Sequence, residues 1–162
     1  MLTSAPSILR RIGAMVYEGL LLLALLLTMS FPVAGLKGAT LVGIPHMAFQ
    51  IYLAAVVAVY FVWCWMRGQT LPMKTWHFCI VDSRGRRLSA GRSLLRLAVA
   101  AVFLGPACIG LVLLFFPQRI SPSIAMWMFI PAIATVLFAR FDSDRQFLHD
   151  KIVGTRLQQV YV

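Results

Sequence analysis

The sequence predicts an all-α membrane protein with four transmembrane helices and a small surface layer on the cytoplasmic side. The chain of 162 residues is 60% hydrophobic and only 12% charged, and its mean hydropathy is +0.85. Soluble domains carry about 25% charged residues, so this composition indicates a membrane protein. The apolar residues gather in four long runs, and a basic segment, residues 67–96, follows the second run. Such a segment between apolar runs is typical of a cytoplasmic loop.

Each predicted span is an apolar run of roughly 20 residues, the length that crosses the hydrocarbon of a bilayer. The spans cover residues 12–31, 47–66, 94–116 and 123–139. A secretory signal peptide is the competing interpretation of the first run, but its length and the spans that follow favour a retained helix. Gly105-Pro106 and Pro131 predict kinks in the third and fourth spans. Alternatively, residues 94–139 form one span and a re-entrant hairpin.

The segments outside the spans carry turn and boundary signals. Glycine and proline predict a loop at residues 32–46 and a tight turn at residues 117–122. Trp63 and Trp65, at the end of the second span, suit the aromatic belt of a membrane boundary. The whole chain, residues 1–162, therefore reads as one membrane domain.

The cytoplasmic-side loop, residues 67–93, is predicted to contain structure of its own. Residues 71–76 predict a short interfacial helix. Residues 77–88 predict a small β-hairpin, because the first of them are β-prone and residues 82–85 form a turn signal. Ser89 is the predicted N-cap of the third span.

The C-terminal tail predicts a short helix followed by a strand. A capping-box pattern at residues 143–146 and a helix-ending glycine, Gly154, place the helix at residues 144–153. Its predicted apolar side contains Phe147, Leu148 and Ile152. Residues 155–162 predict a strand that can pair with residues 77–81.

This tail, residues 140–162, is predicted to pack on the basic loop. Its acidic residues, Asp142, Asp144 and Asp150, are the candidates to pair with arginines of the loop. We expect such pairs to be partly wet, so that each contributes at most about 1 kcal/mol.

The distribution of basic residues predicts the orientation. The N-terminus, residues 67–96 and the tail carry 13 of the 15 lysines and arginines, and the other side carries Lys37 and Arg119 only. By the positive-inside rule both termini are cytoplasmic, which requires an even number of spans. The basic loops are expected to contact anionic lipid headgroups. Nucleic acid is not an expected partner, since little basic surface remains once the spans are removed.

Glu18 is the most informative candidate residue, because it is an acidic side chain inside the first span. It lies seven residues after Arg11, on nearly the same helix face and roughly 10 Å further along the axis. A carboxylate at that depth costs a few kcal/mol, so we expect it to be protonated, paired or facing water. Arg96 is the preferred partner, with Arg11 and Arg140 as alternatives. Two interpretations stay open: a polar clasp between helices, or an ion or proton site.

A second candidate pair, His149 and Asp150, lies in the tail. The pair could be half of a catalytic or metal-binding set, because His77 lies on the same side of the membrane and could approach it. Alternatively, the pair forms a cap and salt-bridge cluster against the basic loop. The sequence has no nucleophile elbow, P-loop, HExxH or dinucleotide fingerprint. Its three cysteines lack CxxC spacing and suit packing positions. We therefore expect no enzyme activity, cofactor or metal.

An ordered series of motifs resembles the RDD family of bacterial membrane proteins. The motifs are Arg11-x-x-Ala14-x-x-x-Glu18, Gly68-Gln69-Thr70-Leu71-Pro72-Met73-Lys74, Val81-Asp82-x-x-Gly85, Ser93-Leu94-Leu95-Arg96 and Leu148-His149-Asp150-Lys151-x-x-x-Thr155. The family is named for an arginine at the start of the first helix and two aspartates. Arg11 matches the arginine, and Glu18 replaces the first aspartate. Asp150 matches the second, with Asp142 as the alternative, and Pro72 stands where glycine is common.

This resemblance implies a bacterial inner-membrane protein whose molecular role is undefined, with transport proposed. One hypothesis is a transporter of an ion or small solute that uses Glu18, acting alone or as a homo-oligomer. The other is a non-catalytic scaffold or accessory subunit whose basic face binds anionic lipid or a membrane partner protein. Transporters usually show internal repeats or several polar residues at mid-membrane, and this chain shows neither, which favours the second hypothesis slightly.

Overall fold

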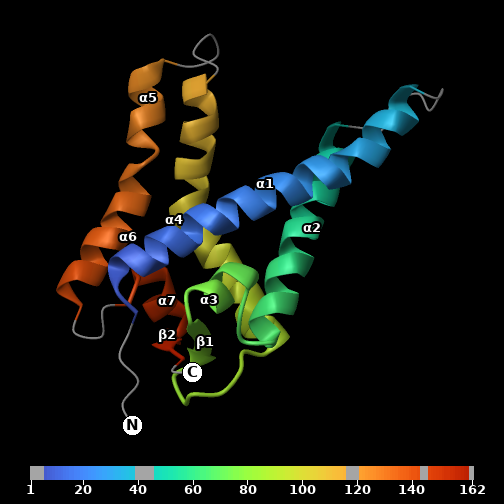
Figure 1. Cartoon of the computed structure of the whole chain (residues 1–162). Coiled ribbons are helices and arrows are strands. Elements are labelled where there is room, and N and C mark those ends of the chain that lie inside the picture. The colour runs from blue at the N-terminus through green and yellow to red at the C-terminus, as the bar shows by residue number, and fades with distance from the viewer. Residues whose placement is uncertain (1–5, 39–45, 116–120, 143–145, 161–162) are drawn as a thin grey trace.

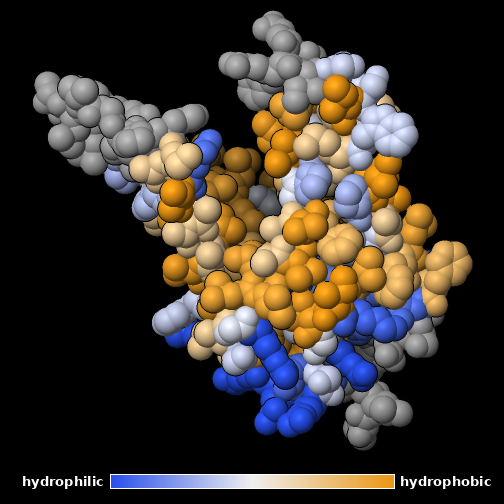
Figure 2. All heavy atoms as spheres, turned by 180° about the vertical axis from the view of Figure 1, so that it is seen from behind, coloured by the Kyte–Doolittle hydropathy of each residue, from blue (hydrophilic) through white to orange (hydrophobic). Residues whose placement is uncertain are grey.

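Four helical segments of the structure are long and apolar enough to cross a membrane, as the sequence predicts. A computed structural model describes residues 6–38, 46–115, 121–142 and 146–160. The long helices are α1 (Ile8–Gly38), α2 (His46–Met66) and α4 (Ala90–Phe115), and the fourth segment combines α5 (Pro122–Trp127) with α6 (Ile130–Phe141). The pair α1 and α2 and the pair α4 and α5/α6 diverge away from a compact layer at one end (Figure 1). In Figure 2 the surface of the helices is largely apolar, and the hydrophilic residues gather at the lower end, over the compact layer.

Two helices are longer than predicted. Helix α1 continues through Pro32 to Gly38, so the predicted loop is wrong for residues 32–38; the rest of it, residues 39–45, lies outside the described residues. One proline removes a single helix N–H, which a long apolar helix tolerates. Helix α4 begins at Ala90 rather than residue 94 because Ser89 is its N-cap, as predicted, and accepts from Arg92 N at 3.4 Å.

The fourth span is interrupted before Pro131, where a kink was predicted. Met128 N and Phe129 N donate to carbonyls only three residues earlier, at 3.3 and 3.1 Å, so the chain tightens between α5 and α6. The segment packs on α4, where a Cβ on Gly110 would lie 2.8 Å from Ala125 O. Helix α4 passes through Gly105-Pro106 without interruption. The two segments therefore run side by side, and each is long enough to cross a membrane. The predicted turn at residues 117–122 lies largely outside the described residues.

A two-stranded antiparallel sheet forms part of the surface layer. Strand β1 (Phe78–Asp82) pairs with β2 (Thr155–Gln159), with Phe78 opposite Gln159 and Asp82 opposite Thr155. The predicted pairing of the tail with residues 77–81 is confirmed, and the predicted hairpin at residues 77–88 is wrong. The residues after Asp82, which would have formed the second strand of the hairpin, are mostly charged and exposed. Strand β2 instead contributes the buried side chain of Leu157 to the core.

The layer is completed by α3 (Leu71–Thr75), the predicted interfacial helix, and α7 (Leu148–Val153). The main apolar core lies in this layer and against the adjoining helix ends. It contains Ala14, Trp65, Met73, Phe78, Ile80, Leu88 and Leu157. Large apolar side chains of the spans are mostly exposed, as suits helices that face lipid.

Candidate functional site

A buried ion pair joins the start of α4 to the tail. The Arg96 guanidinium donates to Asp150 Oδ1 through Nε at 2.9 Å and Nη2 at 2.6 Å. The two side chains are only 6% and 0% exposed. Thr155 Oγ1 donates to the same carboxylate oxygen at 3.4 Å. The predicted pairing of the tail with the basic segment is confirmed, but the expectation of a partly wet pair is wrong.

Aromatic rings extend this pair into a larger cluster. The Arg96 guanidinium carbon lies 4.3 Å from the centre of the Trp65 ring. On the other side, the Phe147 ring stacks on His149 at 5.6 Å, and the Arg11 guanidinium carbon lies 5.3 Å from the Phe147 centre. We call these six residues, Arg11, Trp65, Arg96, Phe147, His149 and Asp150, the buried arginine cluster. It ties α1, α2 and α4 to the tail.

Arg11 enters the cluster from the first turn of α1. Its side chain is buried, and its Nε donates to Pro6 O at 3.0 Å. The cluster thus brings together four of the six predicted site residues, Arg11, Arg96, His149 and Asp150. Sequence reasoning missed Trp65, which is buried here rather than in an aromatic belt; Trp63, two residues earlier, is exposed and fits the belt.

His149 is held in the cluster as a buried imidazole. Its Nε2 lies 3.6 Å from Asp150 Oδ1, and its side chain is almost inaccessible. Burial lowers the pKa of His149, opposed by the Asp150 carboxylate and reinforced by the Arg96 guanidinium. Four buried polar atoms around this pair have no hydrogen-bond partner among the described residues: Trp65 Nε1, Ser93 Oγ, His149 Nδ1 and Asp150 Oδ2.

We expect attachment of the tail to weaken in acid. Because the pKa of His149 is lowered in the folded state, the detached tail binds the proton more readily. The stabilisation is therefore complete above the usual histidine pKa of about 6.5 and is lost as the pH falls through the lowered value. The protection of β2 amides against exchange, relative to the intrinsic exchange rate at each pH, should fall below pH 6 in the wild type and much less in His149→Gln. His77→Gln is the control, because His77 is exposed; equal acid sensitivity in His149→Gln would contradict the prediction.

Glu18 forms a separate polar contact between α1, α2 and α3. Tyr60 donates its hydroxyl to Oε1 at 2.5 Å, and Thr70 donates its hydroxyl to Oε2 at 2.6 Å. Thr70 is also the N-cap of α3 and accepts from Met73 N. The preferred pairing of Glu18 with Arg96 is wrong, because Arg96 lies at the level of the surface layer and binds Asp150. The contact has the geometry of a clasp between helices.

Loss of the Tyr60 hydroxyl should weaken this clasp. We expect Tyr60→Phe to lower the free energy of unfolding by about 1.5–3 kcal/mol, as for a hydrogen bond to a charged group. Tyr60→Phe combined with Glu18→Gln should cost less than the sum of the single changes, since both remove the same contact. Reversible unfolding in mixed micelles measures these values. Glu18→Gln with Arg96→Gln is the control pair and should be additive.

The remaining described acidic residues are also engaged within the protein. Asp142 pairs with Lys151 and accepts from Gln146 N at 3.1 Å. Asp82 is 3.0 Å from Arg92 Nη1, and backbone N–H groups of Arg86 and Arg84 lower its pKa together with the neighbouring guanidinium groups. Asp144 lies outside the described residues.

The tail helix differs in detail from the prediction. Helix α7 begins at Leu148, and Phe147 occupies its N-cap without a side-chain hydrogen bond, so the capping box is wrong. Gln146 Oε1 instead accepts from Leu157 N at 3.1 Å, which links the tail to β2. Gly154 ends the helix with φ of 70°, as predicted. The predicted apolar side is wrong for Ile152, which is exposed, while the polar His149 and Asp150 face inward.

No three His, Cys, Asp or Glu side chains in the described part of the chain are grouped so that they could hold a metal ion. Two shallow, largely apolar grooves on the described surface, one between Ser123 and Ile130 and one between Ala58 and Leu94, are lined by neither Glu18 nor Asp150.

The exposed surface of the layer is basic. Its cations are Arg10, Arg67, Lys74, Arg84, Arg86, Arg87, Arg92, Arg140, Lys151 and Arg156. We call this set the basic face, and Figure 2 shows its hydrophilic colour gathered at the end of the molecule away from the diverging helices.

Comparison with known proteins gives one match. The sequence profile of the RDD family matches residues 5–154. No curated protein sequence and no solved structure matches the chain.

Proposed function

The chain belongs to the RDD family, and from that premise we propose a non-catalytic scaffold or accessory subunit that binds anionic lipid headgroups through its basic face. The proposed location is the bacterial inner membrane, with the surface layer and both termini in the cytoplasm. The observation that carries the proposal is a separation of charge. Every described carboxylate side chain is engaged within the protein. Ten cations are exposed among the described residues, and only three of them, Arg86, Arg92 and Lys151, are partners of these carboxylates.

Four of these cations lie beside exposed apolar side chains, where a headgroup contact is expected. Arg67 covers the Trp63 ring at 4.2 Å. The other three are close in sequence to exposed apolar residues. Arg10 follows Leu9, and Arg140 precedes Phe141. Lys74 comes between Leu71 and Trp76 in the sequence. A basic side chain beside an aromatic or aliphatic one suits the membrane boundary. We call Arg10, Arg67, Lys74 and Arg140 the boundary cations.

Transport is the alternative, and it depends on Glu18. Both oxygens of that carboxylate already accept hydroxyl hydrogen bonds. A site that carries an ion or proton would need to exchange these contacts during each cycle. The clasp geometry therefore supports the scaffold proposal more than the transport hypothesis.

Orientation is tested with reporter fusions. Because 13 of the 15 lysines and arginines lie on one side of the spans, fusions after Arg67 and after Val162 should both report cytoplasm. A fusion near Lys37 should report the periplasm. A periplasmic C-terminus would exclude the proposed topology.

Lipid binding is tested with the full chain in neutral detergent micelles. Adding phosphatidylglycerol should raise the unfolding temperature more than adding phosphatidylcholine does, and added salt should reduce the difference. Neutralising Arg67, Lys74 and Arg140 together should remove most of that difference. Equal effects of the two lipids on the wild type would contradict the proposal.

Flux measurement separates the two hypotheses. Liposomes containing the protein should show no more ion or proton flux than empty liposomes. Flux that disappears in Glu18→Gln, while the variant folds and inserts, would establish the transport alternative instead.

A further inference from the structure

We infer that the turn between β1 and α4 is a docking surface for an acidic segment of a partner protein. The inference rests on the proposed role as an accessory subunit and names the chemistry of its partner. The surface consists of Arg84, Arg86 and Arg87, with Arg92 beside them, and we call it the arginine turn. All four side chains are exposed.

A buried carboxylate preforms this turn. Asp82 Oδ1 accepts from Arg84 N and Arg86 N, each at 2.8 Å. Asp82 N donates to Arg86 O at 2.8 Å, and Gly85, with φ of 74°, donates its N–H to Asp82 O at 3.0 Å. These hydrogen bonds fix the backbone of the turn. The side chains of Arg86 and Arg92 also lie near Asp82 Oδ2, at 3.5 and 3.0 Å. A preformed turn lowers the entropy cost of binding.

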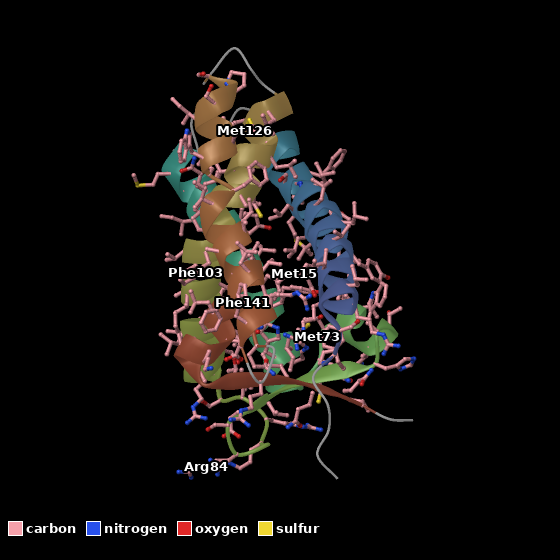
Figure 3. All side chains as sticks on the ribbon, turned by 90° about the vertical axis from the view of Figure 1, so that its left-hand side faces the viewer. Met15, Met73, Arg84, Phe103, Met126 and Phe141 are labelled. Atoms are coloured by element: carbon pink, nitrogen blue, oxygen red, sulfur yellow. The ribbon has the colours of Figure 1, made fainter. Side chains whose placement is uncertain are left out.

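The arginine turn differs from the boundary cations in its surroundings. The apolar residues that flank Arg84, Arg86 and Arg87 in the sequence, Val81 and Leu88, are buried, whereas Arg92 is followed by the exposed Leu94 and Leu95. Residues 81–89 therefore expose no large apolar side chain that could insert at a membrane boundary. In Figure 3, Arg84 lies at the extreme end of the molecule, opposite Met126 and beyond the sheet. The turn thus points away from the spans.

The length of α4 outside the hydrocarbon also places the turn away from the membrane. The uninterrupted apolar sequence of α4 begins at Leu97, seven residues after its first residue, Ala90, which is roughly 10 Å along the axis. The headgroup region on each side of a bilayer is about 5–7 Å thick. Arg84, Arg86 and Arg87 precede Ala90 and are therefore expected to lie beyond the headgroups, whereas Arg92 is in the first turn of α4.

The chemistry of the surface selects carboxylates. Guanidinium groups bind carboxylates through two parallel hydrogen bonds, and one Asp82 cannot neutralise four arginines. The turn is small: residues 84–87 span at most about 14 Å, which matches three or four residues of an extended acidic peptide. Single-stranded nucleic acid would need aromatic side chains for stacking, and the exposed residues of the turn, 83–87, include none.

The acidic segment is not expected to come from a second copy of this chain. The chain has only five acidic residues. Glu18, Asp82, Asp142 and Asp150 are engaged in contacts within the protein, and one further aspartate does not make an acidic segment. The partner is therefore a different polypeptide with clustered Asp or Glu.

The test uses the full chain in phosphatidylcholine nanodiscs and a fluorescent hexaglutamate peptide, with hexaglutamine as the neutral probe. The wild type should bind hexaglutamate in a salt-dependent manner and should not bind hexaglutamine. Arg84→Gln, Arg86→Gln and Arg87→Gln together should weaken binding about tenfold or more. The matched control neutralises Arg67, Lys74 and Arg140, which removes the same charge, and should retain affinity within about twofold.

Two results would overturn the inference. Equal weakening in both triple variants would mean that the peptide senses only net charge. Displacement of the peptide by phosphatidylglycerol in the nanodisc would mean that the turn faces lipid. The proposed function is tested separately, by the rise in unfolding temperature on adding phosphatidylglycerol. If the proposed function holds, neutralising Arg67, Lys74 and Arg140 removes most of that rise, whether or not the peptide binds. Failure of the inference is thereby distinguished from failure of the proposed function.

Discussion

Asp150→Ala should lower the free energy of unfolding by about 3–5 kcal/mol, because it leaves the Arg96 guanidinium buried without its carboxylate. The Arg96 side chain is only 6% exposed, so water cannot replace the lost partner without opening the layer. The tail should detach first, since the pair joins α4 to α7. Reversible unfolding in mixed micelles gives the free energy, and amide exchange of β2 reports the detachment.

Lys151→Met is the matched control for this variant. Lys151 follows Asp150 in the same helix and also forms an ion pair, but its side chain is 51% exposed. Its partner Asp142 is 3% exposed but keeps the hydrogen bond from Gln146 N at 3.1 Å, so this variant should cost clearly less than Asp150→Ala. Asp150→Leu combined with Arg96→Met should be less harmful than either single change, because no charge is then left buried. A double variant as unstable as the sum of its singles would contradict the assigned pairing.

The elements with strong local signals could be predicted from sequence. Long apolar runs determined the four spans, and Ser89 and Gly154 marked helix ends that the structure confirms. A strand at residues 77–81 was also predicted, because these residues are β-prone, and the structure has it at Phe78–Asp82. Its partner was ambiguous, since a turn signal at residues 82–85 is equally compatible with a hairpin and with a strand that pairs elsewhere.

The partners of charged side chains could not be predicted in the same way. Arg96 was assigned to the membrane because the third span was expected to begin at residue 94, soon after the predicted N-cap Ser89. The helix begins at Ala90, so its first turns belong to the surface layer and Arg96 meets Asp150 there. Glu18 was expected to be protonated, paired or facing water, with Arg96 as the preferred partner. Two hydroxyls contact it instead, and no spacing in the sequence connects Glu18 with Tyr60 or Thr70. Contacts between residues more than 40 positions apart depend on helix packing, which local patterns do not determine.

Phe147→Ala is expected to have a comparably large effect on the tail. The side chain is 1% exposed, and truncation of a buried phenylalanine to alanine costs about 3–5 kcal/mol. Its ring also separates two polar groups, with the Arg11 guanidinium on it at 5.3 Å and the His149 ring stacked at 5.6 Å. Removing the ring therefore takes away the contact of Arg11 with Phe147 and opens His149 to water.

The variant should consequently change two measurements together. The free energy of unfolding in mixed micelles should fall, and the acid sensitivity of β2 exchange should diminish, because a hydrated His149 no longer has a lowered pKa. Phe141→Ala is the control, since that side chain is 86% exposed and its loss should change the stability by less than about 0.5 kcal/mol. Arg11→Met in the Phe147→Ala background should cost less than in the wild type, because the contact it would remove is already absent. Equal costs of Arg11→Met in both backgrounds would show that Phe147 packs in the layer without linking α1 to the tail.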